Sequence, residues 1–143
     1  IKSINNKLTT GKCRKTKLGQ QQLLLIVLGI IIVGLVVAVG ISLFSASAVS
    51  SNRDGVVSDL NNLGVIAQQF YKKPTSQGGG GKNFTGWTLP PELDTTANGN
   101  YTRTVAAQSV TIRGYGTERA PNGSKIQHRA TVRPTSITVT KVN

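Results

Sequence analysis

Residues 23–44 read LLLIVLGIIIVGLVVAVGISLF, an apolar run that only Ser42 and three glycines interrupt. As an α-helix, these 22 residues would span about 33 Å, close to the thickness of about 30 Å of a bilayer's hydrocarbon core. A single segment satisfies its backbone polar groups in lipid only as a helix. The run therefore predicts a membrane-spanning helix, and it excludes an ordinary cytosolic enzyme.

Charge is distributed unevenly on the two sides of this run. The chain has 143 residues, with 17 Lys+Arg against 5 Asp+Glu and a net charge of +12. No charged residue lies between Lys17 and Arg53. Six basic residues and no acid precede the run, at Lys2, Lys7, Lys12, Arg14, Lys15 and Lys17. A basic flank of this kind predicts a cytoplasmic N-terminus, with the rest of the chain outside.

A cleavable secretory signal is the alternative to a retained helix. The apolar region of such a signal usually holds about 7–15 residues, fewer than this run. Ala46-Ser47-Ala48 nevertheless has the A-x-A pattern of a signal-peptidase site, and cleavage there would start the mature chain at Val49. The length of the run favours a retained helix.

The glycines of the apolar run leave two interpretations open. Gly29 and Gly34 suit close packing against another membrane helix. Alternatively, Gly34 and Gly40 mark a segment that loosens outside the membrane. Each glycine weakens a helix in water by up to about 1 kcal/mol relative to alanine.

The helical pattern continues beyond the apolar run. Apolar residues recur at spacings of 4, 3, 4 and 3, at Val56, Leu60, Leu63, Ala67 and Phe70. This spacing places them on one stripe of a helix. Pro74 cannot continue a helix, so we expect one helix from about Gln20 to Lys73, whose stripe packs on a folded head.

The composition changes after Pro74. Residues 76–81 read SQGGGG and predict a flexible link. Alternating patterns around Tyr101–Ala106, Val110–Ile112, Ile126–Val132 and Ile137–Val139 predict strands, with turns at Asn98-Gly99 and Pro121-Asn122-Gly123. A sheet of three or four antiparallel strands in so short a segment needs a partner for its apolar face. The stripe from Val56 to Phe70 is the expected partner.

The expected fold class is therefore α+β, with a long N-terminal helix packed on a small antiparallel sheet. We divide the chain into a basic leader (1–19), a membrane helix (20–50), an amphipathic continuation (51–73) and a head with loop and sheet (74–143).

This order of elements resembles a type IV prepilin: a basic leader ending in Gly19, an uncharged helix directly after it, an amphipathic extension, a loop and a small sheet. The resemblance is specific over residues 12–74 and architectural beyond them. In that family a prepilin peptidase cuts after a glycine on the cytoplasmic side, which here implies cleavage between Gly19 and Gln20. The resemblance also implies methylation, an inner-membrane location before assembly, and a pilus assembly machinery as partner.

The resemblance further implies that copies of the chain polymerise through their apolar helices. The residues expected to pack in the core of such a filament are Leu24, Leu28, Ile31, Val33, Leu35, Val37 and Phe44. One position departs from the family pattern, because Leu24 stands where the fifth mature residue is commonly glutamate. Two interpretations remain open: Gln21 or Gln22 substitutes as a weak acceptor for a neighbouring N-terminal amine, or the missing acid marks a minor or tip subunit.

No catalytic, cofactor or metal site is expected from the sequence. His128 is the only histidine, on a predicted strand with no ligand set around it, and the five acids are scattered. The four glycines at 78–81 lack the Lys-Ser/Thr of a phosphate loop. The single cysteine, Cys13, permits no intramolecular disulfide.

Two kinds of surface site remain as expectations. Asn83, Asn100 and Asn122 begin N-x-S/T sequons on the part of the chain predicted to lie outside, so they are candidate glycosylation sites. Residues 72–143 carry 10 basic and 3 acidic side chains, with Tyr101 and Tyr115 on or near strands. This composition is typical of a domain that binds DNA or an anionic surface, and also of a charged surface that only keeps an extracellular domain soluble.

The sequence thus predicts a structural filament subunit rather than an enzyme. The alternatives are a pseudopilin or minor pilin of a secretion system, and a single-span anchored protein whose basic domain binds DNA or envelope polymer.

Overall fold

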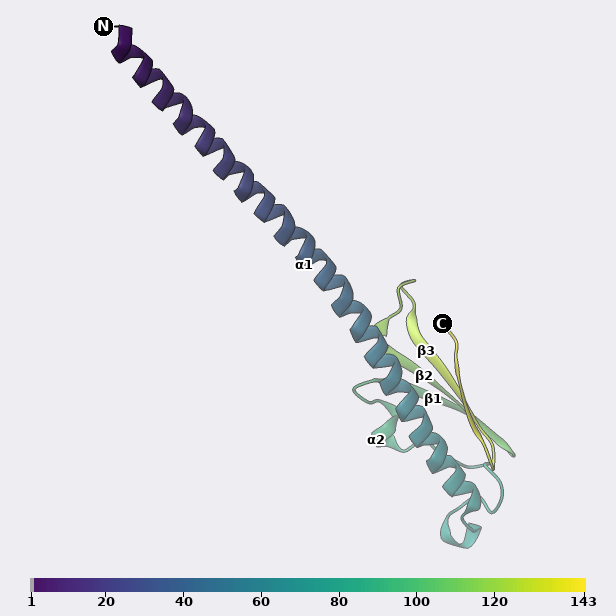
Figure 1. The fold of residues 1–143 in the computed structure, drawn as a ribbon. Coiled ribbons are helices and arrows are strands. Elements are labelled where there is room, and N and C mark those ends of the chain that lie inside the picture. The colour runs from purple at the N-terminus through teal and green to yellow at the C-terminus, as the bar shows by residue number, and fades with distance from the viewer. Residues whose placement is uncertain (1) are drawn as a thin grey trace. The chain divides into compact units, whose positions relative to one another are not determined.

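The computed structural model describes the backbone of residues 2–143 and the side chains from Lys17 onward. It confirms the expected α+β class, with one long N-terminal helix and a four-stranded antiparallel sheet (Figure 1). The elements in chain order are α1 (Lys2–Lys72), a 3-10 turn η1 (Thr75–Gln77), α2 (Pro91–Asp94), β1 (Gly99–Ala106), β2 (Ser109–Arg119), β3 (Lys125–Val132) and β4 (Ile137–Lys141).

The long helix begins earlier than the sequence pattern predicts. We expected a start near Gln20, but α1 includes the leader from Lys2 onward and ends at Lys72, directly before Lys73-Pro74. The leader contains no proline, and a lone glycine weakens a helix without ending it, which explains why no break separates leader from apolar run. The side chains before Lys17, and with them Cys13, lie outside the described residues.

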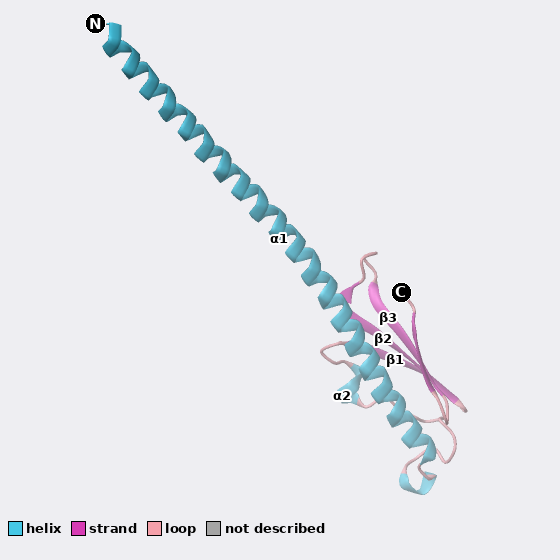
Figure 2. Ribbon diagram, in the orientation of Figure 1, coloured by secondary structure: helices cyan, strands magenta, loops and turns pink. Residues whose placement is uncertain are grey.

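The chain divides into two compact units, residues 1–44 and residues 45–143. The described residues of the first unit, 2–44, are all helical. The second unit contains the rest of α1, the loops and the sheet. From here on, the head means this whole unit, residues 45–143, and no longer residues 74–143 alone. In the head, α1 lies along one face of the sheet (Figure 2).

The glycine-rich segment after Pro74 is not the flexible link that its composition suggested. It folds back on the end of α1, where backbone N–H groups of Gly80, Gly81 and Lys82 donate to the carbonyls of Phe70, Lys73 and Tyr71 at 2.8, 2.9 and 2.8 Å. These bonds satisfy carbonyls that the end of a helix otherwise leaves unpaired. A Cβ at Gly80 would collide with the Asn83 carbonyl, so the close approach requires glycine there.

The sheet has the strand order β1-β2-β3-β4, and each strand pairs with its neighbour in the chain. The predicted turn at Pro121–Gly123 does connect β2 to β3, and Gly123 has the positive φ of 80° that such turns favour. The other predicted turn, at Asn98-Gly99, does not join two strands of the sheet. It lies at the start of β1, where the Thr96 N–H donates to the Gly99 carbonyl at 2.8 Å and Thr95 forms an antiparallel bridge with Asn100. Ala107 and Gln108 instead join β1 to β2, a connection with no glycine, asparagine or proline to signal it.

The core of the head lies between α1 and one face of the sheet. Val56, Leu60, Leu63 and Ala67 of α1 are at most 1% exposed. They pack in one cluster with apolar side chains of the sheet and of the loop before it, namely Phe84, Trp87, Leu89, Tyr101, Val110, Ile112, Ala130 and Val132. Burial of this apolar surface is the main stabilising contribution in the head.

Two glycines of β2 set how closely the helix approaches the sheet. A Cβ at Gly114 would press on Val56 and Tyr101, and one at Gly116 would collide with the Asn52 side chain. The helix therefore lies against bare strand backbone at this point.

Candidate functional site

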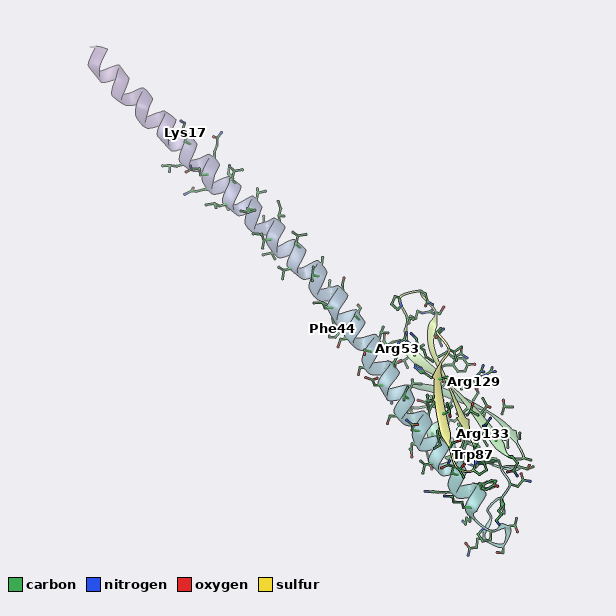
Figure 3. The ribbon with its side chains drawn as sticks, turned by 45° about the vertical axis from the view of Figure 1, so that its right-hand side comes forward. Lys17, Phe44, Arg53, Trp87, Arg129 and Arg133 are labelled. Atoms are coloured by element: carbon green, nitrogen blue, oxygen red, sulfur yellow. The ribbon has the colours of Figure 1, made fainter. Side chains whose placement is uncertain are left out.

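The most prominent surface of the chain is the apolar half of α1. Every Leu, Ile, Val and Phe side chain in residues 23–44 is between 52% and 78% exposed. Figure 3 shows these side chains projecting on all sides of the ribbon between Lys17 and Phe44. All seven residues expected in a filament core, Leu24, Leu28, Ile31, Val33, Leu35, Val37 and Phe44, belong to this exposed set.

This surface is far larger than soluble proteins leave uncovered. Contiguous exposed apolar patches on soluble monomers rarely exceed a few hundred Å², and larger ones mark membrane or protein contacts. Within the described residues, one helix is long and apolar enough to cross a membrane, and it includes this run. The segment therefore has the length and composition of a membrane span.

No described residue packs against the glycines of the run. A Cβ added at Gly29, Gly34 or Gly40 would meet nothing within 4 Å. Glycine is thus not required at these positions by any described contact of a single chain. Gly19 also has open space around it, and Gln20, Gln21 and Gln22 are exposed.

A second feature is a polar network that connects α1 to the start of β1, which we call the Asp59 network. One carboxylate oxygen of Asp59, Oδ2, accepts hydrogen bonds from Tyr101 Oη at 2.7 Å, Thr96 Oγ1 at 2.8 Å and Asn98 Nδ2 at 3.0 Å. Asn52, two turns earlier on the helix, donates from Nδ2 to the Asn98 carbonyl at 2.8 Å and accepts the Glu118 N–H at 3.2 Å. These bonds fasten the loop before β1, and part of β2, to the helix.

The network changes the acidity of both its main partners. Burial by itself raises the pKa of Asp59, but the hydrogen bonds from Tyr101, Asn98 and Thr96 outweigh it and leave that pKa below its usual value. Burial, followed by the hydrogen bond to Asp59, raises the pKa of the Tyr101 hydroxyl. Tyr101 is only 2% exposed, so it is unavailable for stacking on a ligand, contrary to its possible role in binding DNA.

His128 lies on the same buried face of the sheet as the core. It is 6% exposed, and its Nδ1 atom has no hydrogen-bond partner in the structure. Burial lowers the pKa of His128, and the positive charges of Arg53 and Lys141 lower it further. Among residues 17–143, no cluster of three His, Cys, Asp or Glu side chains has the geometry to hold a metal ion.

The three sequon asparagines lie in different surroundings. Asn122 is exposed in the turn between β2 and β3, where its Oδ1 accepts the Ser124 N–H at 3.1 Å. Asn83 is half-buried and makes the same type of bond to Thr85 at 2.8 Å. Asn100 is exposed on β1, and its Nδ2 donates to Thr95 Oγ1 at 3.4 Å.

The Asp59 network was not predicted from the sequence, although one residue, Asn52, signals it. Asn52 precedes Val56 by four residues, so it continues the apolar stripe with a polar side chain. A polar residue at a buried position needs hydrogen-bond partners. Those partners, Asn98 and Thr117, are 46 and 65 residues away, and no local pattern identifies them.

Comparison of the chain with protein-family models, with curated protein sequences and with solved structures gave no match.

Proposed function

We propose that this protein is a structural subunit of an extracellular type IV pilus-like filament. The observation that carries the proposal is the apolar surface of residues 23–44, exposed on all sides of a helix that follows Gly19 and a basic leader. The subunit resides in the inner membrane before assembly, and its partners are further copies of itself, a prepilin peptidase and a pilus assembly machinery.

An apolar helix of this length needs a covering of matching length and chemistry. In the membrane, lipid provides it. Outside the membrane, the same helix of other copies provides it, and burying such a surface contributes roughly tens of kcal/mol before the entropy of association is subtracted. Because a head-to-tail contact that does not close extends without limit, helices packed in this way form a filament.

The charge distribution supports removal of the leader before assembly. Residues 1–19 carry six basic residues and no acid, so cleavage after Gly19 leaves 11 basic against 5 acidic residues and lowers the net charge from +12 to +6. Uncleaved leaders would bring six positive charges per copy next to one another in an apolar bundle. Repulsion and desolvation of those charges oppose packing.

The first test is the N-terminal residue of the protein recovered from cells, determined by intact mass and N-terminal peptide sequencing. We expect a chain that begins at Gln20, and filaments in the sheared extracellular fraction that contain this chain. A chain that begins at Val49 would contradict the proposal, because a soluble secreted domain has no helix with which to polymerise. An intact leader on chains that never leave the membrane would contradict it as well, and would indicate an anchored protein.

A minor pilin or pseudopilin is the second candidate, and Leu24 favours it. Leu24 replaces the acid that commonly pairs with a neighbour's N-terminal amine. Antibody labelling of filaments distinguishes the two roles: a major subunit labels filaments along their whole length, and a minor subunit labels them sparsely or at one end.

A further inference from the structure

The face of the sheet turned away from α1 carries ordered rows of polar side chains. Along each regular strand, alternate residues face the core, and the residues between them face outward. The strand register aligns the outward residues in three rows across the sheet: Thr104, Thr111, Thr131 and Thr138; Thr102, Arg113, Arg129 and Thr140; Asn100, Tyr115 and Gln127. Figure 3 shows Arg129 on this side of the sheet.

Two arginines stand directly opposite each other in the middle row. Arg113 of β2 pairs in register with Arg129 of β3, the two central strands. The Cβ atoms of such a pair are about 5 Å apart, and like charges at this position destabilise a sheet. The packing of the sheet thus offers no reason for this pair.

The four strands contain almost no acid that could neutralise the two arginines. The only acid within the four strands is Glu118, in the irregular stretch between Tyr115 and Arg119. The Nε atom of Arg129 is buried without a hydrogen-bond partner in the structure. The exposed Arg113 guanidinium and the terminal Nη atoms of Arg129 remain as donors for an anion.

An aromatic ring lies beside the arginines on the same face. Tyr115 follows Arg113 by two residues, which places their side chains about 7 Å apart along the strand. Asn100 and Gln127 flank Tyr115 in its row, and threonine hydroxyls flank the arginines in theirs. Proteins that bind single-stranded nucleic acid combine cationic groups for phosphates with aromatic rings on which bases stack.

We propose that this face, defined by Arg113, Tyr115 and Arg129, binds a single strand of nucleic acid. The two guanidinium groups hold backbone phosphates, a base stacks on Tyr115, and the flanking amides and hydroxyls donate hydrogen bonds to the strand. Acidic side chains are absent from all three rows, so no repulsion opposes a polyanion. The site belongs to the head and does not depend on filament assembly.

The first experiment tests the arginine pair with the full chain in uncharged detergent micelles. Binding of a fluorescent thymidine oligonucleotide of about 20 nucleotides is followed by anisotropy at several salt concentrations. The double variant Arg113→Gln/Arg129→Gln should weaken binding by about tenfold or more, and should reduce the slope of log K against log salt by about 1.4. The matched control Lys72→Gln/Lys73→Gln removes the same charge at exposed positions outside the sheet and should stay within about twofold of the parent.

Folding of the variants is checked by the emission of Trp87, the only tryptophan and a buried one. If the double glutamine variant fails to fold, Arg113→Lys/Arg129→Lys keeps the charge and removes the planar forks, and it should still weaken binding severalfold. Equal losses in the sheet variants and in the Lys72/Lys73 control would overturn the proposal, because they would show that net charge alone attracts the strand. Absence of binding to the parent chain would overturn it as well.

A second experiment distinguishes a nucleic acid from other polyanions. Tyr115→Ala should weaken binding of the thymidine oligonucleotide by about tenfold, the effect of losing one stacked base. The same substitution should leave binding of an abasic oligonucleotide unchanged, since that strand has phosphates but no bases. If the abasic strand or the polyuronate alginate binds the parent as tightly as the thymidine strand, the face recognises negative charge only and the proposal is wrong.

Discussion

Asp59, like Asn52, makes three side-chain hydrogen bonds that connect α1 to the loop and the sheet. Its Oδ2 atom receives three donors, from Thr96, Asn98 and Tyr101, and thus connects α1 to the segment that begins the sheet. The Tyr101 ring is at the same time part of the apolar core. Loss of the carboxylate therefore leaves a buried hydroxyl without its acceptor, which destabilises more than the loss of an exposed bond.

Asp59→Ala should lower the free energy of unfolding of the head by about 1–2 kcal/mol, a value reduced for the solvent exposure of the carboxylate. Asp54→Ala is the matched control, since it makes the same substitution at an exposed position of the same helix. Urea unfolding followed by Trp87 emission measures both. Equal free energies of unfolding for the two variants would contradict the prediction, because they would show that the hydrogen bonds of Asp59 do not stabilise the head.

His128 gives the head a predictable response to mild acid. Its pKa is lowered in the folded state, by burial first and then by Arg53 and Lys141, so the unfolded chain binds the proton more tightly. The free energy of unfolding therefore decreases as the pH falls through the pKa of histidine in the unfolded chain, about 6.5. The decrease levels off below the pKa of His128 in the folded state. The Asp59 carboxyl acts at lower pH, because its stabilisation is lost only as pH falls below its ordinary pKa of 3.8 toward its folded value.

We therefore expect the urea midpoint of the parent head to decrease between about pH 7.5 and pH 5.5. His128→Gln has no titrating group at this position and should show a smaller decrease over the same range. The measurement is the difference between the two midpoints for each protein, so an overall loss of stability in the variant does not obscure the result. An identical decrease in both proteins would assign the pH response to other groups.

At the scale of the element, α1 has two halves with opposite requirements. Residues 56–70 present one apolar stripe, which the sheet covers. Residues 23–44 present exposed apolar side chains on all sides of the helix. The same type of substitution should thus have different consequences in the two halves.

Val33→Asp and Val37→Asp should each abolish filaments, because a charge buried in an apolar helix bundle without a partner is strongly destabilising. Val65→Asp is the matched control, since Val65 is 45% exposed on the head half of the same helix, and it should assemble normally. Electron microscopy of the sheared fraction measures the outcome. Filaments of normal abundance from either Val33→Asp or Val37→Asp would contradict assembly through this helix.

An aspartate in the apolar run also disfavours membrane insertion, by about 3 kcal/mol at the centre of the span. Gly34→Leu separates insertion from packing, because leucine is well tolerated in lipid and its Cβ meets nothing within 4 Å in the single chain. We expect normal membrane levels of this variant and few filaments. Full assembly would instead favour the second interpretation of these glycines, a segment that loosens outside the membrane.

At the scale of the whole molecule, local patterns predicted most elements. The four-residue and three-residue spacing from Val56 to Phe70 identified the helix face that packs on the sheet, and alternation around Ile126–Val132 identified a central strand. Both patterns work because burial on one face repeats with the period of the backbone. The prediction of a flexible link at residues 78–81 was wrong because it rested on composition. Glycines show that a backbone can adopt many conformations, but they do not show that its N–H groups donate to carbonyls at the end of α1.

The sequence by itself determined that this protein has an apolar helix of membrane length, a basic segment before it, and an amphipathic continuation with a small sheet. These properties follow from hydrophobicity, charge and period, which act on neighbouring residues. Only the tertiary structure decided which distant residues meet. Tyr101 donates a hydrogen bond to Asp59, the charges of Arg53 and Lys141 act on His128, and Arg113 pairs in register with Arg129. Strand register and helix–sheet packing bring these groups together, and both depend on contacts between residues far apart in the chain.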